Sequence, residues 1–262
     1  MFVENILKRF NMQACNPVST PMESGTKLCG SDTSEKGIAE YRQLIGGLMY
    51  LMLGSRSDLC FSVSYFSRFQ DCAKLVHWNC WKRVLRYLRG TASNELVYEN
   101  DANTVPLRGF VDSDWANDAE DRRSTSGFLF QVYGNTVSWS TRKQGLVALS
   151  TTEAEYIAAA SAVSEALWLK KLFSDIGIPL KSTVPIMEDN QGCLFIAKNP
   201  ETKRSKYVDV KYHMVRENAW NKEVDLIYVP SEDQIVDILT KPLSKNQFEK
   251  LCRMMGLERG GV

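Results

Sequence analysis

Apolar residues in the first ninety positions recur every three or four residues, which is the spacing of one helical face. The clearest case is the segment 77–88, where Trp78, Trp81 and Val84 share one face. The same spacing predicts earlier helices over residues 3–10, 38–53 and 59–69. Prolines, glycines and hydroxyl-bearing residues crowd positions 16–36, so we interpret that stretch as a loop or linker. The first part of the chain is therefore predicted to be helical.

After a boundary at positions 90–94 the pattern changes to short apolar and β-branched runs, which are typical of strands. The predicted strands are 96–98, 107–111, 128–133, 137–140, 184–187 and 224–229. Gly134 and Asn135 join two of them as a hairpin turn. The predicted helices are 152–173, 190–197, 210–221, 233–239 and 245–255. Antiparallel strands followed by alternating helices and strands predict an α/β fold with a mixed sheet.

The composition is that of an ordinary globular protein: 44% of the 262 residues are hydrophobic and 24% are charged. No apolar run approaches the roughly 20 residues that cross a bilayer, and the N-terminus lacks the pattern of a secretory signal. The seven cysteines are odd in number and form no Cys-x-x-Cys pair, which favours free thiols in a reducing compartment. We therefore expect a cytoplasmic protein.

Four acidic residues occupy informative places in this layout. Asp112 and Asp189 end predicted strands, Glu155 lies near the start of the long helix, and Asp237 lies in the helix after the last strand. Strand ends and helix starts expose side chains to a shared crevice in an α/β sheet. Only two histidines are present, so a metal would have to sit mainly on carboxylates. Mg²⁺ and Mn²⁺ prefer such oxygen ligands, and two ions ~3.5–4 Å apart can promote phosphodiester hydrolysis.

Each acid also has a simpler interpretation. Asp189 can be the N-cap of the following helix, and Glu155 can favour a helix N-terminus through the dipole. Asp114 shares a strand face with Asp112, so it remains a possible substitute. Glu153 points about 200° away from Glu155 on a helix, so only one of the two can face the site.

A series of segments in this chain carries a resemblance to a known family. In the second part they are 109–116 (Gly-Phe-Val-Asp-Ser-Asp-Trp-Ala), 121–128 (Asp-Arg-Arg-Ser-Thr-Ser-Gly-Phe), 137–144 (Val-Ser-Trp-Ser-Thr-Arg-Lys-Gln), 148–158 (Ala-Leu-Ser-Thr-Thr-Glu-Ala-Glu-Tyr-Ile-Ala), 188–191 (Glu-Asp-Asn-Gln), 209–213 (Asp-Val-Lys-Tyr-His) and 232–243 (Glu-Asp-Gln-Ile-Val-Asp-Ile-Leu-Thr-Lys-Pro-Leu). In order and spacing they resemble the C-terminal ribonuclease H region of copia-type LTR retrotransposon Pol polyproteins. In the helical part, 17–22 (Pro-Val-Ser-Thr-Pro-Met), 41–46 (Tyr-Arg-Gln-Leu-Ile-Gly) and 81–91 (Trp-Lys-Arg-Val-Leu-Arg-Tyr-Leu-Arg-Gly-Thr) resemble the reverse transcriptase thumb and connection.

The resemblance implies two domains: a helical thumb/connection remnant at 1–92 and a ribonuclease H-like domain at 93–262, with a mixed five-stranded sheet and flanking helices. It implies that the enzyme cleaves the RNA strand of RNA/DNA hybrids with two Mg²⁺ ions, Mn²⁺ being possible. The rest of a retrotransposon reverse transcriptase is an implied partner. The implied catalytic and metal-binding residues are Asp112, Glu155, Asp189 and Asp237. Glu155 is preferred to Glu153 because the Ala-Glu-Tyr-Ile-Ala segment matches the family's helix.

Two departures from the family pattern stand out. The family commonly has histidine where this chain has Tyr207, which puts a step in product release or substrate contact in doubt. It also tends to have Arg-Pro-Asp where this chain has Arg56, Ser57 and Asp58, which we expect to loosen a turn. The Tyr-Val-Asp-Asp turn of a polymerase palm does not occur in the sequence, so no polymerase activity is expected from this chain.

Basic residues that would bind the hybrid backbone form one clear stripe. Lys82, Arg86 and Arg89 lie at i, i+4 and i+7, opposite the apolar face of their helix; the alternative is a merely solvated face. Lys and Arg contacts to phosphates supply most of such affinity. Further candidates are Arg122, Arg123, Arg142, Lys143, Lys203, Arg204 and Lys206. We interpret Trp78 and Trp81 as core residues rather than base-stacking ones, and favour a core position for His213 over a role as general acid.

The sequence thus predicts a ribonuclease H-type endonuclease. Its main rival is a non-catalytic remnant that keeps the fold and acts as a nucleic-acid-binding or interaction module.

Overall fold

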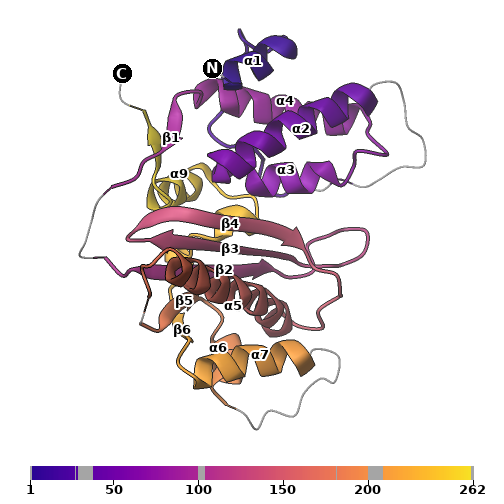
Figure 1. The fold of residues 1–262 in the computed structure, drawn as a ribbon. Coiled ribbons are helices and arrows are strands. Elements are labelled where there is room, and N and C mark those ends of the chain that lie inside the picture. Colours follow the sequence, from indigo (N-terminus) through magenta and orange to yellow (C-terminus); the bar gives the residue numbers. More distant parts are fainter. Residues whose placement is uncertain are drawn as a thin grey trace. The chain divides into compact units, whose positions relative to one another are not determined.

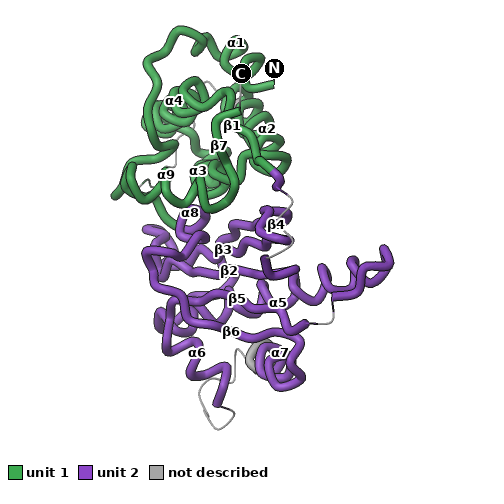
Figure 2. Tube along the Cα trace, turned by 90° about the vertical axis from the view of Figure 1, so that its left-hand side faces the viewer, with its two compact units in different colours: residues 1–97, 241–262 green, residues 98–240 purple. Residues whose placement is uncertain are grey.

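The structure, a computed structural model, describes residues 2–26, 28, 38–99, 104–180, 182–199 and 209–260. The chain divides into two compact units, coloured separately in Figure 2. Unit 1 contains residues 1–97 and 241–262, and unit 2 contains residues 98–240.

Unit 1 is mainly helical, as predicted. Its elements are α1 (Phe2–Arg9), α2 (Ile38–Gly54), the 3₁₀ turn η1 (Ser57–Leu59), α3 (Cys60–Ser67), α4 (Leu75–Gly90), β1 (Asn94–Leu96), α9 (Lys245–Met254) and β7 (Leu257–Arg259). Trp81 is fully buried, and its ring meets Tyr41 and Phe66 edge-on at centroid distances of 5.7 and 5.1 Å. Its predicted core position is therefore confirmed. Trp78 is half-buried beside Phe10.

The C-terminal segment belongs to unit 1, which differs from the predicted division at residue 92. β7 pairs antiparallel with β1, so the strand predicted at 96–98 begins at Asn94 and lies outside the main sheet. α9 buries Phe248 and Leu251, and the Phe248 ring packs edge-on against Tyr87 of α4 at 5.6 Å. An amphipathic helix packs wherever it finds a matching apolar surface, and here that surface is on α4.

A buried ion pair closes the turn between α2 and α3. Nε and Nη2 of Arg56 donate to the two Asp58 carboxylate oxygens at 3.0 and 2.8 Å, and the Tyr87 hydroxyl donates to Asp58 at 2.6 Å. Arg56 also donates to the backbone oxygen of Thr91 at 3.0 Å. These charge-assisted bonds of Arg56 hold the turn closed, and the expectation that Ser57 loosens it stays a prediction.

Unit 2 is built on a mixed five-stranded sheet in the order β4-β3-β2-β5-β6, visible in Figure 1. The strands are β2 (Leu107–Asp114), β3 (Thr125–Val132), β4 (Asn135–Lys143), β5 (Val184–Glu188) and β6 (Val224–Tyr228). β2, β3 and β4 pair antiparallel, whereas β5 runs parallel to both β2 and β6. The predicted α/β class and mixed five-stranded sheet are confirmed.

The helices of unit 2 include one long element and several short ones. They are α5 (Thr151–Asp175), α6 (Gln191–Lys198), α7 (Asp209–Trp220), η2 (Ser231–Asp233) and α8 (Asp237–Thr240). α5 packs over β2 and β3, and its alanine-rich face joins Val111 and Phe130 in one buried cluster. The single helix predicted at 233–239 is wrong, because the chain forms η2, an extended Gln234, and then α8.

The other sheet face receives α8, and a glycine makes room for it. Gly127 lies directly opposite Asp112 in the β2–β3 pair. A Cβ atom on Gly127 would lie 2.8 Å from Val236 Cγ1 and 2.9 Å from Thr240 Cγ2. Alternation along the strand therefore directs Val111 toward α5 and Asp112 toward α8.

Two further properties of the described residues bear on the sequence predictions. The six cysteines among them are free thiols, in line with the expectation from their spacing. None of the described helices combines the length and apolar character that crossing a membrane demands.

Candidate metal centre

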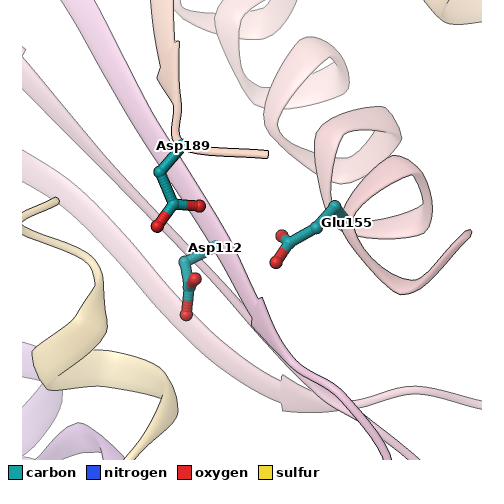
Figure 3. Close-up of side chains that lie close together, drawn as sticks. All are labelled: Asp112, Glu155 and Asp189. Atoms are coloured by element: carbon teal, nitrogen blue, oxygen red, sulfur yellow. The ribbon is translucent and has the colours of Figure 1, made fainter. Parts of the chain in front are cut away.

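Three carboxylates from three separate elements converge in unit 2. Asp112 lies on β2, Glu155 on α5, and Asp189 directly after β5. One oxygen from each lies within 4.8 Å of the others, and Figure 3 shows the three side chains close together, with the Glu155 carboxylate pointing toward the two aspartates. Asp112 and Glu155 are buried, and Asp189 is half-buried. The structure thus brings together three of the four acids singled out in the sequence.

Strand register explains why the two aspartates meet. Phe110 of β2 lies beside Met187 of the parallel strand β5. Two residues further along each strand, the same register leads to Asp112 and Asp189. Parallel neighbours end at the same edge of a sheet, so the two side chains face one crevice.

The start of α5 separates Glu155 from Glu153. Ser150 caps the helix by accepting from the Glu153 N–H at 3.2 Å, and Glu153 Oε2 accepts from the Leu149 N–H at 2.8 Å. Glu153 thus binds the N–H of the residue before the cap, so its side chain is engaged at the start of α5. Glu155, two residues on, faces the cluster.

Asp237 and Asp114 are not members of the three-carboxylate group. Asp237 is buried at the first position of α8, one turn before Thr240. Asp114 is half-buried as the last residue of β2. The assignment of Asp237 as a fourth ligand stays a prediction.

Two hydroxyl groups that the sequence analysis missed touch the carboxylates. The Thr240 hydroxyl donates to Asp112 Oδ2, and the Ser231 hydroxyl donates to Asp189 Oδ2 at 2.6 Å. Thr240 lies in one of the segments that resemble the family, but no spacing rule connects it with residue 112, which is 128 positions away.

Glu188 is a further acid next to the cluster, and the sequence analysis did not single it out. Its side chain is fully buried, and its Oε1 accepts from the Asn190 N–H at 2.9 Å. Burial raises the pKa of Glu188 well above its ordinary value despite the Asn190 bond, and the carboxylates of Asp112 and Asp189 raise it further. The Asn190 side chain meanwhile accepts from the Cys193 N–H and caps α6, so Asp189 is not the cap.

The basic residues of unit 2 that were predicted to contact phosphates differ in exposure and pairing. Arg122 and Arg142 are exposed. Lys143 is paired with Asp118 at 2.6 Å and with Asp121 at 2.9 Å, so its charge is already balanced within the protein. Lys203, Arg204, Lys206 and Tyr207 lie outside the described residues.

The basic stripe on α4 of unit 1 is partly engaged with its own chain. Nε of Arg86 donates to the Asn16 backbone oxygen and Nε of Arg89 to the Gln13 oxygen, both at 2.7 Å. Lys82 is exposed. The stripe therefore fastens residues 13–16 to α4, and a role in nucleic-acid binding stays a prediction.

His213 does not lie in the core, and that interpretation was wrong. It is exposed on α7 and lines a cavity of about 570 Å³ together with Trp220 and Asp225. Trp115 is 42% exposed, and its Nε1 donates to the Ala148 oxygen at 3.1 Å. That bond ties the end of β2 to the loop before α5.

The donor set of the cluster fits a hard divalent cation. All three groups offer carboxylate oxygens, the donors that Mg²⁺ and Mn²⁺ prefer. Three carboxylates this close also repel one another, which favours binding a cation.

Three converging carboxylates on a mixed five-stranded α/β sheet are the features to set beside known proteins. No protein-family model matches the chain. It is 36% identical over 264 residues to the retrovirus-related Pol polyprotein from transposon TNT 1-94 of Nicotiana tabacum, matching 98% of this chain and 20% of that polyprotein. It is also 36% identical over 255 residues to the Pol polyprotein from transposon RE2 of Arabidopsis thaliana, matching 97% of this chain and 17% of that polyprotein. The chain belongs to the family of retrovirus-related Pol polyproteins of copia-type transposons, and it spans 17–20% of the length of these two relatives.

Solved structures show a weaker likeness. LC11-RNase H1, isolated from compost by a metagenomic approach, is 14% identical, with a TM-score of 0.41 over 56% of this chain and 98% of that one. The fold assignment rests on the sheet order and not on this similarity.

Proposed function

We propose that unit 2 is a ribonuclease H-type endonuclease that hydrolyses the RNA strand of an RNA/DNA hybrid. One observation carries the proposal: carboxylate oxygens of Asp112, Glu155 and Asp189, from three elements, lie within 4.8 Å of one another. Membership of the Pol polyprotein family supports the choice of a hybrid as substrate, because such polyproteins include a ribonuclease H region.

Asp112, Glu155 and Asp189 are the residues that would hold Mg²⁺ or Mn²⁺, and we propose Asp237 as the additional ligand for a second ion. When bound, such ions lower the pKa of a water molecule and stabilise the charge on the leaving oxygen. The protein's own contribution is to fix the carboxylates on rigid elements. Exposed Arg122 and Arg142 in the same unit are the proposed contacts to backbone phosphates.

The wider setting is also a proposal. The rest of a retrotransposon reverse transcriptase is the proposed partner of this chain, acting in the cytoplasm, a virus-like particle or the nucleus. No polymerase activity is proposed for the chain itself.

The test is cleavage of a labelled RNA/DNA hybrid in Mg²⁺ or Mn²⁺ by the full chain and by Asp112→Asn and Asp189→Asn. We expect each substitution to reduce the rate by at least about 100-fold, the scale of losing one preorganised electrostatic group. Asp225→Asn is the matched control, because Asp225 is a half-exposed acid of β6 that forms a loose ion pair with Lys198 at 3.9 Å. Circular dichroism checks that each variant is folded.

Equal rates for the full chain and the Asp112 and Asp189 variants would refute the nuclease proposal. A gel shift with the same hybrid then separates the alternatives. Binding that survives both substitutions without cleavage would identify a nucleic-acid-binding remnant instead.

A further inference from the structure

The segment 231–240 reaches both strands that carry the aspartates. Nε2 of the fully buried Gln234 donates to the Val111 oxygen at 3.0 Å and to the Met187 oxygen at 3.4 Å. Val111 precedes Asp112, and Met187 lies two residues before Asp189. One side chain thus bridges β2 and β5 directly behind the metal centre.

The two ends of the same segment each place a hydroxyl on a carboxylate. Ser231 donates to Asp189 Oδ2 at 2.6 Å, and Thr240 donates to Asp112 Oδ2. A threonine hydroxyl has one proton to donate. The helix oxygens of Val236 and Asp237 are both 3.4 Å away and Asp112 is nearer, so the proton goes to Asp112.

An aspartate carboxylate needs such a contact to hold one orientation. Its terminal torsion is broad and roughly two-fold, so the strand alone does not fix where each oxygen points. A hydrogen-bond donor on Oδ2 fixes the position of that oxygen. The other oxygen, Oδ1, then points away from the donor. Carboxylates that bind metals are commonly held by hydrogen bonds of this kind.

We propose that Thr240 and, to a smaller degree, Ser231 are positioning residues that orient Asp112 and Asp189 for metal binding. The inference rests on the proposed function and deepens it. Thr240 is fully buried and Asp112 is 2% exposed, so solvent does not replace a lost bond there. Ser231 is exposed, and water substitutes for its hydroxyl. The two substitutions should therefore differ in effect.

The experiment measures Mn²⁺ affinity of the full chain without nucleic acid, by the paramagnetic resonance signal of free Mn²⁺. Thr240→Val should weaken binding about 10- to 100-fold, the usual effect of removing a partner of a metal ligand. Thr240→Ser keeps the hydroxyl and should restore most of the affinity. Ser231→Ala should weaken binding less than Thr240→Val does.

Matched controls remove hydroxyls that do not touch the cluster. Thr141 donates to the Leu239 oxygen at 2.8 Å, so Thr141→Val loosens the same α8 segment without touching a carboxylate. Ser138 donates to Glu165 at 2.6 Å, away from the cluster. Thr141→Val and Ser138→Ala should bind Mn²⁺ as the unmodified chain does.

Two outcomes overturn the inference and are distinguishable. If Asp112→Asn weakens Mn²⁺ binding and Thr240→Val does not, the metal centre stands and the positioning role fails. If Asp112→Asn leaves binding unchanged, the metal centre and the proposed function fail together with the inference. Should Thr240→Val not fold, Thr240→Ala compared with Thr240→Ser isolates the hydroxyl, and equal affinities of those two variants would also overturn it.

Discussion

Each unit of this protein buries acidic side chains, but the two groups of acids are arranged differently. In unit 1 the buried Asp58 carboxylate is enclosed by the Arg56 guanidinium and the Tyr87 hydroxyl. In unit 2 the buried Asp112 and Glu155 carboxylates gather with Asp189, and hydroxyls of Thr240 and Ser231 contact two of the three. The first acid has its counter-ion within the fold, whereas the second group concentrates like charge.

This difference indicates opposite roles for the two sites. A buried acid with its own arginine fixes a turn and needs nothing from outside the protein. Three acids within 4.8 Å repel one another, and a bound cation relieves that repulsion.

The largest expected effect is in unit 1. Arg56→Met leaves the Asp58 charge buried without its partner and should destabilise the unit by about 3–5 kcal/mol. The double variant Arg56→Met with Asp58→Leu should recover much of the loss, because no buried charge remains. Urea unfolding measures the free energies, and hydrogen exchange of peptides from residues 38–97 locates the change. If the double variant were as unstable as Arg56→Met, the unpaired charge of Asp58 would not be the cause of the loss.

The next effect concerns metal addition and unit 2. At a Mn²⁺ concentration of 100 times Kd, binding should stabilise the folded state by about 2.7 kcal/mol. Protection from hydrogen exchange should rise in peptides from residues 104–199, and addition of EDTA should reverse it. Peptides from residues 38–97 serve as the internal control. If Mn²⁺ raised hydrogen-exchange protection equally in both units, or in neither, the proposed difference between the two groups of acids would be wrong.

A smaller effect is expected from an ion pair at the periphery of unit 2. Burial alone would raise the pKa of Asp118, but Lys143 and the N–H groups of Glu120 and Asp121 outweigh it and hold the pKa well below its ordinary value. Since the folded pKa is depressed, this stability is present above the ordinary value of 3.8 and is lost as pH falls through the folded pKa.

Asp118→Asn should therefore cost roughly 2 kcal/mol at pH 7 and progressively less below about pH 4. Urea midpoints from pH 7 to pH 2.5 give the comparison, with the half-exposed Asp225→Asn as control. A constant difference across that range would show that the charge of Asp118 is not responsible.

The smallest effect separates two neighbouring glutamates on α5. Glu153→Gln weakens the helix cap and should cost at most about 1 kcal/mol while leaving Mn²⁺ affinity unchanged. Glu155→Gln should lower Mn²⁺ affinity without a comparable loss of stability, because it relieves repulsion among the acids. Urea unfolding and Mn²⁺ titration of both variants test this difference. If Glu153→Gln lowered Mn²⁺ affinity and Glu155→Gln did not, Glu153 would be the metal ligand instead.

Periodicity predicted most helices and strands of both units, because each buries a regular face. It failed at 233–239, where the buried Gln234 side chain donates to the oxygens of Val111 and Met187 in the sheet, and the chain forms two short helical turns in place of one helix. His213 was misplaced because a lone histidine in a helical pattern does not reveal which side of the helix is buried. Asp112 and Asp189 could be selected from their places at strand ends, and Glu155 only with the help of the family resemblance.

Local spacing and ordered motifs in the chain are enough to predict the α/β class, the family and the acids available for a metal centre. Which of these acids meet depends on the folded arrangement, because Asp112 and Asp189 come together through the parallel register of β2 and β5. The folded arrangement also places α9 in unit 1 and Thr240 against Asp112. These contacts join residues far apart in the sequence, 128 positions in the case of Thr240 and Asp112, where no local pattern carries information about distance.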